Sequence, residues 1–572
     1  MFRLARFLKN YKKQLVIGPL FKLTEAVFEL IVPLCMAAII DVGIGGGDTG
    51  YIWRMGGIMA ALAAVGLCCA LVCQVYASAA SQGVGTELRT ALYAHILTLS
   101  GAETDRLGAS SRAQRMTGDI NAVQLAVAML IRLVIRAPFL AIGAVVMAFT
   151  IDSRLALILL AAVPLISLVL YLIMSRSVPF FSAIQKKLDK IALITRENLS
   201  GARVIRAFSS EEREERRFSD SCDDHAATAV RVGRLSALLN PVTSVIMNLG
   251  ILLLLRLGAL RVDSGSLTQG QLIALVNYMN QILLALIVIA NVVVIFTKAS
   301  ASAARINEVF DIKPSVVQPS EPLAFADSVT AVEFDNVSFG YGGGDVLRDI
   351  SFTVNAGENI GIIGGTGSGK STLAALIERF YDVSGGAVRV FGTDVRSLSF
   401  DALRGAIGLV PQKAALISGT VASNLQMGAP EADDERLLSA LHTAQADFVL
   451  EKPGALESRV EQYGRNFSGG QRQRLTIARA LAQQPRILIL DDSASALDAA
   501  TDAALRSAIA SELDGVTVIT ISQRVSGIRR CDRIFVMDDG ALAGVGTHAE
   551  LYKNCGVYRE ICQSQGAGEE NA

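Results

Sequence analysis

Six stretches of mostly apolar residues, each about 20 residues long, dominate the chain before residue 300. They run approximately over residues 22–41, 56–77, 131–150, 155–174, 241–260 and 272–296. An apolar helix of about 20 residues crosses the hydrocarbon core of a bilayer, where every backbone polar group must find an internal partner. The sequence therefore predicts an all-α transmembrane domain of six helices over residues 1–311.

The connections between these stretches alternate in length. The links 78–130 and 175–240 are long, charged and helical in pattern, whereas the other links are short. Arginine and lysine crowd both long links and the N-terminal segment, which places them on the cytoplasmic side of a multi-pass protein of the cell (plasma) membrane. Each long link needs a turn at its far tip, and we expect these turns near residues 104–119 and 208–218. The basic N-terminus is interpreted as the start of a retained span.

The composition changes after residue 311. A linker with three prolines is expected over residues 312–330. From 331 to 563, short β-rich runs alternate with helical segments, which predicts a cytoplasmic α/β domain with a largely parallel sheet. Residues 564–572 are expected to form a disordered tail. Basic and acidic residues number 53 each, so the net charge gives no indication of a nucleic-acid partner.

A glycine-rich loop stands between a β-rich run and a helical segment of this second domain. The sequence "GGTGSGKST" comprises Gly364, Gly365, Thr366, Gly367, Ser368, Gly369, Lys370, Ser371 and Thr372. Its spacing fits the phosphate-binding P-loop, in which glycine N–H groups and a helix N-terminus surround phosphate oxygens. We expect Lys370 to reach the β- and γ-phosphates of ATP and the Ser371 hydroxyl to bind Mg²⁺.

Two further elements fit a nucleotide site. Asp491 ends the aliphatic run "RILIL", where a carboxylate at the end of a central strand can hold Mg²⁺. The run "SGGQ", which comprises Ser468, Gly469, Gly470 and Gln471, forms a second anion-binding helix start. One phosphate loop already serves the triphosphate, so a spare site makes sense if it addresses nucleotide held by another subunit.

The order of these motifs resembles the nucleotide-binding domain of the ABC transporter superfamily. With six preceding spans, nearly the whole chain is similar to an exporter half-transporter, fused to a P-loop ATPase domain. The resemblance implies that Tyr341 stacks on adenine, that Gln412 senses Mg²⁺ and the membrane domain, and that Asp498 ends a loop between paired sites. It also implies that the "SGGQ" run clamps ATP on the opposite subunit, and that the two cytoplasmic tips are coupling helices.

The sequence departs from the family pattern at two catalytic positions. Asp492 stands where the family has its general-base Glu, and Gln523 stands where it has a switch His. Aspartate is one methylene shorter, and a misplacement of about 1 Å can cost about 10²-fold in rate; Gln523 carries no titratable proton. These losses beside an intact "SGGQ" predict a weakly hydrolytic subunit of a heterodimer. A homodimer that tolerates Asp492 is the alternative.

Charged residues also occur inside the predicted spans. Lys22, Glu25 and Glu29 share one face of the first span, and Arg132 and Arg136 repeat a four-residue step in the third. Unpaired charges are costly in a bilayer, so we expect ion pairs or a water-filled cavity. Two interpretations stay open, which are structural ion pairs and a polar wall that recognises substrate. Three amides of the last span, Asn277, Asn280 and Gln281, are weaker candidates.

The resemblance implies ATP-driven efflux of hydrophobic or amphipathic compounds, such as drugs or lipids, by alternating access. A homodimeric lipid or peptide exporter, or a nucleotide-gated channel or sensor, is the alternative. A peptide exporter with its own protease domain is less favoured, because no such segment precedes the spans. A soluble ATPase that acts on DNA is excluded by the six spans.

Overall fold

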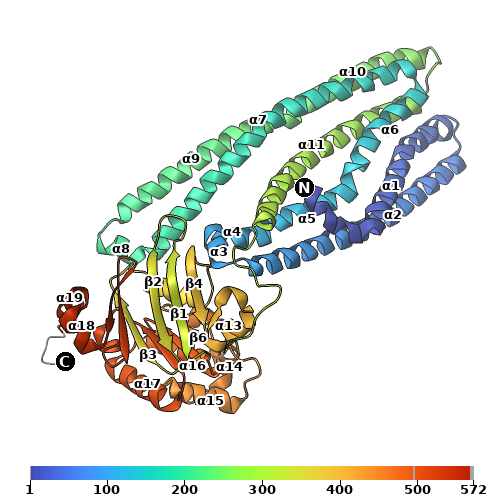
Figure 1. Ribbon diagram of the computed structural model, residues 1–572. Helices are drawn as coiled ribbons and strands as arrows, with labels where there is room; N and C mark the ends of the chain where they lie inside the picture. The colour runs from blue at the N-terminus through green and yellow to red at the C-terminus, as the bar shows by residue number, and fades with distance from the viewer. Residues whose placement is uncertain (1, 327, 494–495, 567–572) are drawn as a thin grey trace. The chain divides into compact units, whose positions relative to one another are not determined.

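The computed structural model describes residues 2–326, 328–493 and 496–566. The chain forms two compact units, one of residues Met1–Leu97 with Ala109–Ile312 and one of Thr98–Gly108 with Lys313–Ala572. The first unit is helical and the second contains the sheets, as the colours of Figure 1 show along the chain. The predicted fold class, a six-helix membrane domain fused to an α/β domain, is confirmed.

The helices of the first unit are long and joined by short turns. They are η1 (Phe2–Tyr11), α1 (Lys12–Ala38), η2 (Ile39–Ile44), α2 (Thr49–Thr98), α4 (Ala109–Gln114), η3 (Arg115–Asp119), α5 (Ile120–Met129), η4 (Leu130–Val134), α6 (Arg136–Ile151), α7 (Ser153–Ser200), α8 (Ala202–Ala207), α9 (Glu211–Ala237), α10 (Leu239–Asp263) and α11 (Gln269–Asp311). Among the described residues, six helical stretches are long and apolar enough to cross a membrane. Each contains one of the predicted spans, so the prediction is confirmed.

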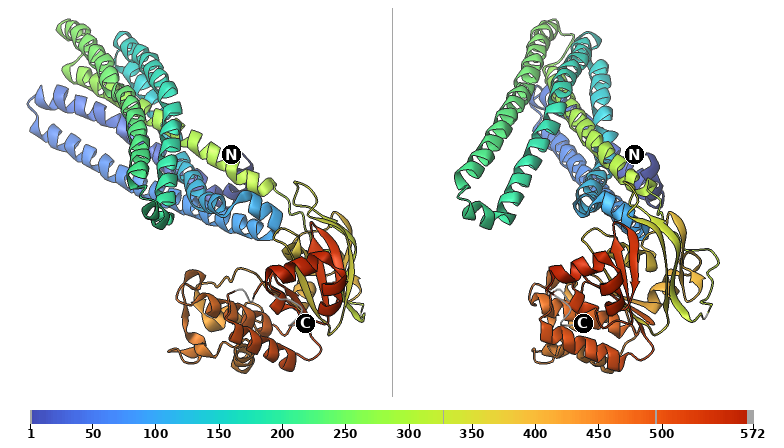
Figure 2. Two further views of the ribbon diagram at one scale, coloured as in Figure 1. Left: turned by 90° about the vertical axis from the view of Figure 1, so that its left-hand side faces the viewer. Right: turned by 60° about the vertical axis from the view of Figure 1, so that its left-hand side comes forward.

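Helix α11 is the centre of this unit, since it packs against α1, α6, α7 and α10. Small residues such as Ala144 and Ala148 let the helices approach closely around the buried Tyr278. The Tyr278 hydroxyl donates to the carbonyl oxygen of Leu30 at 2.7 Å, which joins α11 to α1. Helices α7 and α9 run side by side (Figure 2), and Lys187 binds Asp224 between them at 2.6 Å.

A short helix precedes the turn of each long link: α3 (Gly101–Leu107) comes before Gly108, and α8 comes before residues 208–210. These turns lie within the predicted ranges 104–119 and 208–218. The acidic run in the second range is not part of the turn and begins α9, with Glu211, Glu212 and Glu214 in its first turn. Carboxylates at a helix N-terminus favour the helix through its dipole, which explains why this charged run is not a turn.

The second unit contains two main sheets. The strands are β1 (Thr330–Phe339), β2 (Leu347–Asn355), β3 (Asn359–Gly364), β4 (Gly385–Val390), β5 (Thr393–Asp394), β6 (Ile407–Val410), β7 (Gly419–Thr420), β8 (Arg459–Val460), β9 (Ile487–Asp491), β10 (Thr517–Ile521), β11 (Arg533–Asp538) and β12 (Ala541–Gly546). The six-stranded sheet has the order β12-β11-β3-β10-β9-β6 and is parallel except at β12. The largely parallel sheet is confirmed. A second, antiparallel sheet of order β2-β1-β4-β5 was not predicted.

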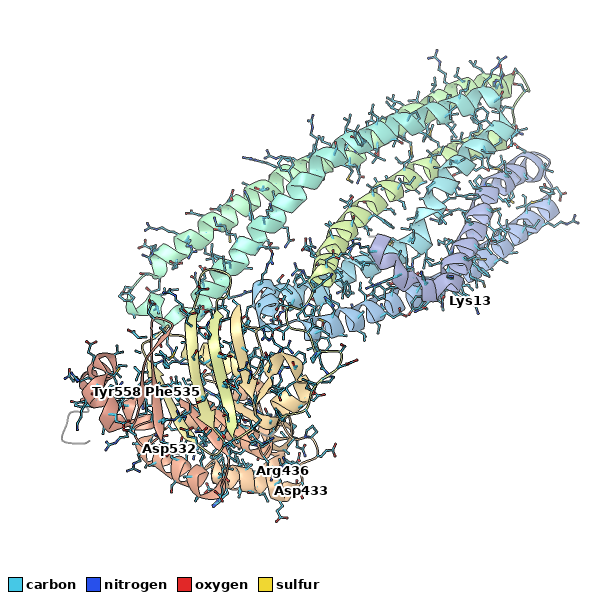
Figure 3. All side chains as sticks on the ribbon, viewed as in Figure 1. Lys13, Asp433, Arg436, Asp532, Phe535 and Tyr558 are labelled. Carbon is cyan, nitrogen blue, oxygen red and sulfur yellow. The ribbon has the colours of Figure 1, made fainter. Side chains whose placement is uncertain are left out.

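Helices cover the parallel sheet. They are α12 (Lys370–Ile377), α13 (Phe400–Ala406), α14 (Val421–Leu425), α15 (Asp434–Thr443), α16 (Gly469–Ala482), α17 (Ala499–Glu512), α18 (His548–Asn554) and α19 (Gly556–Ser564), with short 3-10 turns η5 (Val395–Ser397), η6 (Asp447–Val449), η7 (Ala455–Glu457), η8 (Gln462–Gly464) and η9 (Val525–Gly527). Asp433 caps α15 by accepting from the Arg436 backbone N–H at 3.0 Å (Figure 3). Tyr558 and Phe535, labelled in the same figure, are buried.

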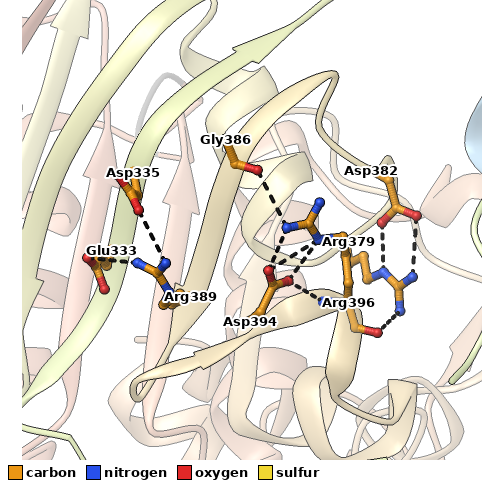
Figure 4. A network of polar contacts seen from close by, with 8 residues as sticks. All are labelled: Glu333, Asp335, Arg379, Asp382, Gly386, Arg389, Asp394 and Arg396. Carbon is orange, nitrogen blue, oxygen red and sulfur yellow. Dashed lines mark hydrogen bonds and ion pairs between the residues drawn. The ribbon is translucent and has the colours of Figure 1, made fainter.

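Ion pairs brace the antiparallel sheet and the end of α12 (Figure 4). Arg389 on β4 reaches Glu333 and Asp335 on β1 at 3.0 and 3.2 Å. The remaining pairs are Arg396 with Asp394 at 2.6 Å and Arg379 with Asp382 at 2.8 Å. The pair Arg379–Asp382 brackets Tyr381 in sequence. The Tyr381 ring packs on Tyr341, and its hydroxyl forms a hydrogen bond with Asp105 of α3. The Arg379–Asp382 ion pair therefore holds the backbone segment that carries Tyr381.

Candidate functional site

The glycine loop turns between β3 and α12, at the centre of the parallel sheet. Gly367 and Gly369 have φ angles of 85° and 94°, in the left-handed region that favours glycine. A side chain on Gly364 would place its Cβ 2.2 Å from the carbonyl oxygen of Met537. The glycines therefore allow a backbone path that directs the loop around the N-terminus of α12, as phosphate binding requires.

Lys370 is folded over this loop. Its ammonium group donates to the carbonyl oxygens of Gly364 and Gly365 at 2.9 and 2.6 Å and to the Ser368 hydroxyl at 3.2 Å. Burial lowers the pKa of Lys370, and the nearby carboxylates of Asp491 and Asp492 oppose that change. The ammonium is thus held by weak neutral acceptors, which a phosphate oxygen can replace as a stronger, charged one.

Asp491 ends β9 and faces the start of α12. Its Oδ1 accepts a hydrogen bond from the Ser371 hydroxyl at 3.1 Å. Burial raises the pKa of Asp491, an effect that the Ser371 hydrogen bond counters and that neighbouring Asp492 reinforces. A hydroxyl and a carboxylate oxygen side by side are the hard ligands that Mg²⁺ takes together with phosphate oxygens.

Asp492 has an uncommon backbone conformation. Its φ angle of 45° is left-handed, and its backbone N–H donates to the Ile521 carbonyl at 2.8 Å. The Gln412 side-chain amide donates to Oδ2 of Asp492 at 3.3 Å. A left-handed residue other than glycine costs of order 1 kcal/mol, and such strain gathers at functional sites. The hydrogen bond to β10 fixes the backbone of Asp492, and the hydrogen bond from Gln412 orients its carboxylate.

These elements enclose a cavity of about 270 Å³. The structure brings ten of the predicted residues to its wall, namely Thr366, Gly367, Gly369, Lys370, Ser371, Thr372, Gln412, Asp491, Asp492 and Gln523. Val346, Ile521 and Ser522 also line it and were not predicted. Ile521 and Ser522 directly precede Gln523 at the end of β10, so their position before a site residue was the available signal. Val346 follows a run of glycines, and no pattern in the sequence indicated that it would line the site.

The Gln523 backbone is fixed by the end of the last helix. The Gln565 side-chain amide donates to the Gln523 carbonyl at 2.7 Å, and its oxygen accepts from the Val525 N–H at 2.9 Å. The tail predicted to be disordered from residue 564 is corrected here, because Ser564 ends α19 and Gln565 is bound. Residues 567–572 of that tail lie outside the described residues.

Tyr341 lies beside the cavity, with its side chain 55% exposed. Its hydroxyl is 3.2 Å from that of Thr372. Its ring meets those of Phe339 and Tyr381 edge to face, with centroids 4.9 and 5.1 Å away. Two aromatic neighbours thus fix one edge of the ring and leave the other side open to a flat ligand.

The "SGGQ" run and Asp498 lie outside this cavity. Ser468 and Gln471 form a reciprocal cap at the start of α16: the Ser468 hydroxyl accepts from the Gln471 N–H at 3.2 Å, and the Gln471 side chain accepts from the Ser468 N–H at 3.0 Å. Among the described residues, a Cβ added at Gly469 would meet no atom within 4 Å beyond the backbone of its own helix. Gly470 follows Gly469 in the first turn of the helix. Asp498 caps α17, and hydrogen bonds from Thr501 lower its pKa.

Comparison with known proteins identifies the family to which this chain belongs. Residues 15–286 match the ABC transporter transmembrane region, and residues 347–495 match the ABC transporter family. An uncharacterized ABC transporter ATP-binding protein of Mycobacterium tuberculosis is 38% identical over 98% of this chain and 97% of its own length. The chain is an ABC transporter.

Other ABC transporters agree with this placement. The multidrug efflux ATP-binding/permease protein of M. tuberculosis is 32% identical over 98% of this chain, which covers 47% of that longer protein. The probable multidrug resistance transporter YheI of Bacillus subtilis is 34% identical over 84% of this chain and 82% of its own. The fold matches that of a bacterial Atm1-family ABC exporter with ATP bound, with a TM-score of 0.80, 24% identity and 99% of each chain covered.

Membership defines the general activity. This ABC transporter joins the transmembrane region of the family to its ATP-binding domain in one chain, and its ATPase activity is coupled to transport. It is a multi-pass protein of the plasma membrane, and its nucleotide-binding domain is cytoplasmic. The predicted family, enzyme class and location are confirmed.

Proposed function

We propose that this chain is the weakly hydrolytic half of a heterodimeric exporter that moves hydrophobic or amphipathic compounds out of the cell. Its own P-loop grips ATP, and its "SGGQ" run completes the competent site of a second half-transporter. The observation that carries this proposal is that Asp492 and Gln523 line the same cavity as an intact phosphate loop.

The roles within the site follow from the contacts. The loop of Gly364 to Thr372 surrounds the phosphates, and Lys370 exchanges its carbonyl partners for the β- and γ-phosphates. The open side of Tyr341 takes the adenine ring. Ser468, Gly469, Gly470 and Gln471 present the start of α16 to the partner's triphosphate, and Asp498 lies at the loop between the two sites.

The residues present fit Mg²⁺. Ser371, Asp491 and Gln412 line the same cavity, and each offers an oxygen atom that can coordinate Mg²⁺. Across the described residues, no cluster of three His, Cys, Asp or Glu side chains is built to hold a metal without further ligands. A cation that takes most of its ligands from phosphate and water suits this set. When bound, Mg²⁺ would neutralise charge on the phosphates.

Slow hydrolysis follows from side-chain reach. The Asp492 carboxylate ends one methylene nearer its backbone than glutamate would, and its hydrogen bond to Gln412 holds it at the wall. A misplaced base of about 1 Å lowers the rate by about 10²-fold. Gln523 can donate to the γ-phosphate but cannot carry a charge. The site therefore retains ATP through many cycles of the partner's site.

Transport follows from a shift between two states. ATP contacts the P-loop of one subunit and the "SGGQ" run of the other only when the two domains close. Because ATP binds the closed dimer better, it favours that state and turns the membrane cavity outward. Hydrolysis at the partner's competent site reopens the dimer.

Two preparations test this proposal: the purified chain alone, and the chain co-expressed with a second half-transporter that carries the catalytic Glu and the switch His. We expect slow ATP hydrolysis by the chain alone. With the partner, we expect at least about tenfold faster turnover and ATP-dependent accumulation of a hydrophobic dye in inverted vesicles. Brisk hydrolysis and transport by the chain alone would overturn the heterodimer, and a continuous ion leak without accumulation would overturn export.

A further inference from the structure

Two cavities inside the membrane unit meet at one ion pair. The first, of about 400 Å³, lies between α1, α2 and α6, and the second, of about 200 Å³, lies between α1, α6 and α11. Glu29 and Arg136 line both. Apolar side chains such as Phe28, Leu67 and Leu284 form most of the remaining walls. An apolar site with a few convergent polar groups is the usual form of a small-molecule site.

The pair lies deep in the bilayer. Glu29 precedes the end of η2 at Ile44 by 15 residues, which is about 22 Å of helix. The hydrocarbon core is about 30 Å thick, so a group that far from the outer end lies in its inner half. Charges at such a depth are costly and mark functional sites unless they only join helices.

The first cavity presents two carboxylates and one guanidinium group to a ligand. Two acids, Glu25 and Glu29, line it with one base, Arg136. Lys22 binds Glu25 at 2.6 Å but lines neither cavity. Arg132 lines neither cavity as well, and it donates to the Ser78 hydroxyl at 3.2 Å. Because Lys22 neutralises Glu25, Glu29 is the carboxylate that a cation would take, in competition with Arg136.

Glu29 is the more accessible partner of the ion pair. Its side chain is 41% exposed and that of Arg136 is 20% exposed, with 2.6 Å between them. Glu25 lies 3.9 Å from the same guanidinium nitrogen. If a ligand takes Glu29, Arg136 therefore keeps a carboxylate, whereas an anion at Arg136 would compete with two.

Two buried polar atoms fit this exchange. The Gln281 amide donates to the Glu29 carbonyl at 3.1 Å, which fixes its orientation. Within the described part of the chain, no hydrogen-bond partner reaches Oε1 of Gln281 or Nε of Arg136. The first is an acceptor beside the cavity that suits a positive group, and the second is a donor that Glu25 can satisfy when Arg136 turns toward it.

We infer that Glu29 anchors a binding site for amphipathic organic cations between α1, α2, α6 and α11. The cation pairs with the Glu29 carboxylate, its apolar part fills the two cavities, and Arg136 passes to Glu25. This inference rests on the proposed export function and names its substrate class.

Equilibrium binding to the nucleotide-free transporter in detergent tests the site without transport. The probes are tetraphenylphosphonium and tetraphenylborate, which have nearly the same size and opposite charge. We expect the native protein to bind the cation more tightly, and Glu29→Gln to weaken cation binding by about tenfold while anion binding stays unchanged. Glu308→Gln is the matched control, because Glu308 is exposed on α11 and binds Arg115 away from the cavities. This control should leave both affinities within about twofold of the native values.

A charge exchange separates recognition from helix joining. Glu29→Arg combined with Arg136→Glu keeps an ion pair but makes the accessible member positive. Recognition predicts that this variant prefers tetraphenylborate, whereas a purely structural pair predicts that it restores the native preference. Restoration, equal binding of both probes by the native protein, or equal loss of both in Glu29→Gln would overturn the inference.

ATP-driven accumulation of tetraphenylphosphonium in inverted vesicles, with the membrane potential collapsed, separates the two proposals. Charge-dependent binding without accumulation would leave the site standing and overturn export. Accumulation of a neutral dye with cation binding unaffected by Glu29→Gln would leave export standing and overturn the site.

Discussion

The side chain of Gln565 holds the backbone of Gln523 at 2.7 Å, although 42 residues separate them. The same side chain accepts from Val525 at 2.9 Å, so one amide clamps both ends of a three-residue segment. Gln523 lines the cavity beside Asp492. The end of helix α19 therefore fixes the backbone from which the Gln523 side chain extends toward the cavity.

Replacing this clamp should loosen the grip on nucleotide. Each hydrogen bond contributes about 1 kcal/mol net, so Gln565→Ala should speed dissociation of labelled ATP from the assembled transporter several-fold. Gln565→Glu keeps the acceptor for Val525 and loses the donor to Gln523. Its ATP dissociation rate should lie between those of the native protein and Gln565→Ala. The exposed neighbour Gln563→Ala is the control. Identical dissociation rates for all four proteins would show that the clamp does not position Gln523.

Restoring the longer carboxylate should restore hydrolysis. We expect Asp492→Glu with Gln523→His to raise ATP turnover of the chain alone by up to about 10²-fold, because the base regains its reach. Steady-state phosphate release measures the effect. Adding Lys370→Ala to the same variant should abolish the gain, since Lys370 is the loop cation. Turnover that stays slow in the double variant would place the defect outside these two side chains.

A buried carboxyl makes stability depend on pH. Burial raises the pKa of Glu378 from its ordinary value of 4.5 to about 7, an effect that the Arg404 cation opposes. The folded protein thus keeps a proton that the unfolded chain releases. Its stabilising contribution is complete below pH 4.5 and is lost as the pH rises through 7. The free energy of unfolding changes by on the order of 3 kcal/mol in this interval.

Glu378→Gln removes this titrating group, so the difference in Tm between the variant and the native protein should depend on pH. We expect the Tm of the variant, relative to the native protein, to rise between pH 5 and pH 7 and to level off above pH 7, as measured by scanning calorimetry. Glu431→Gln, an exposed site on the same domain, should give a constant difference. A constant difference for Glu378→Gln as well would mean that Glu378 does not change its protonation over this range.

The sequence was sufficient wherever one physical requirement has one structural answer. An apolar run of about 20 residues has to cross the bilayer, and "GGTGSGKST" between a strand and a helix has to form a loop. The second cytoplasmic turn was predicted to be too long, because acids such as Glu211 occur at helix starts as well as in turns. Gln565 was missed because its partners are backbone atoms, which leave no pattern in the residue types.

Two of the reciprocal helix caps of the nucleotide-binding domain allow a matched test of the partner's site. Ser468 caps α16 with Gln471, and Thr547 caps α18 with Glu550 in the same way. Substitution of either by alanine costs about 1 kcal/mol of helix stability. Only Ser468 belongs to the run that we propose addresses the partner's ATP. Ser468→Ala should therefore lower ATP turnover of the heterodimer at least about tenfold, with unchanged ATP binding to this chain's own loop. Thr547→Ala should lose a similar few degrees of Tm and keep its turnover. Equal turnover in the two variants would contradict a role for Ser468 at the partner's site.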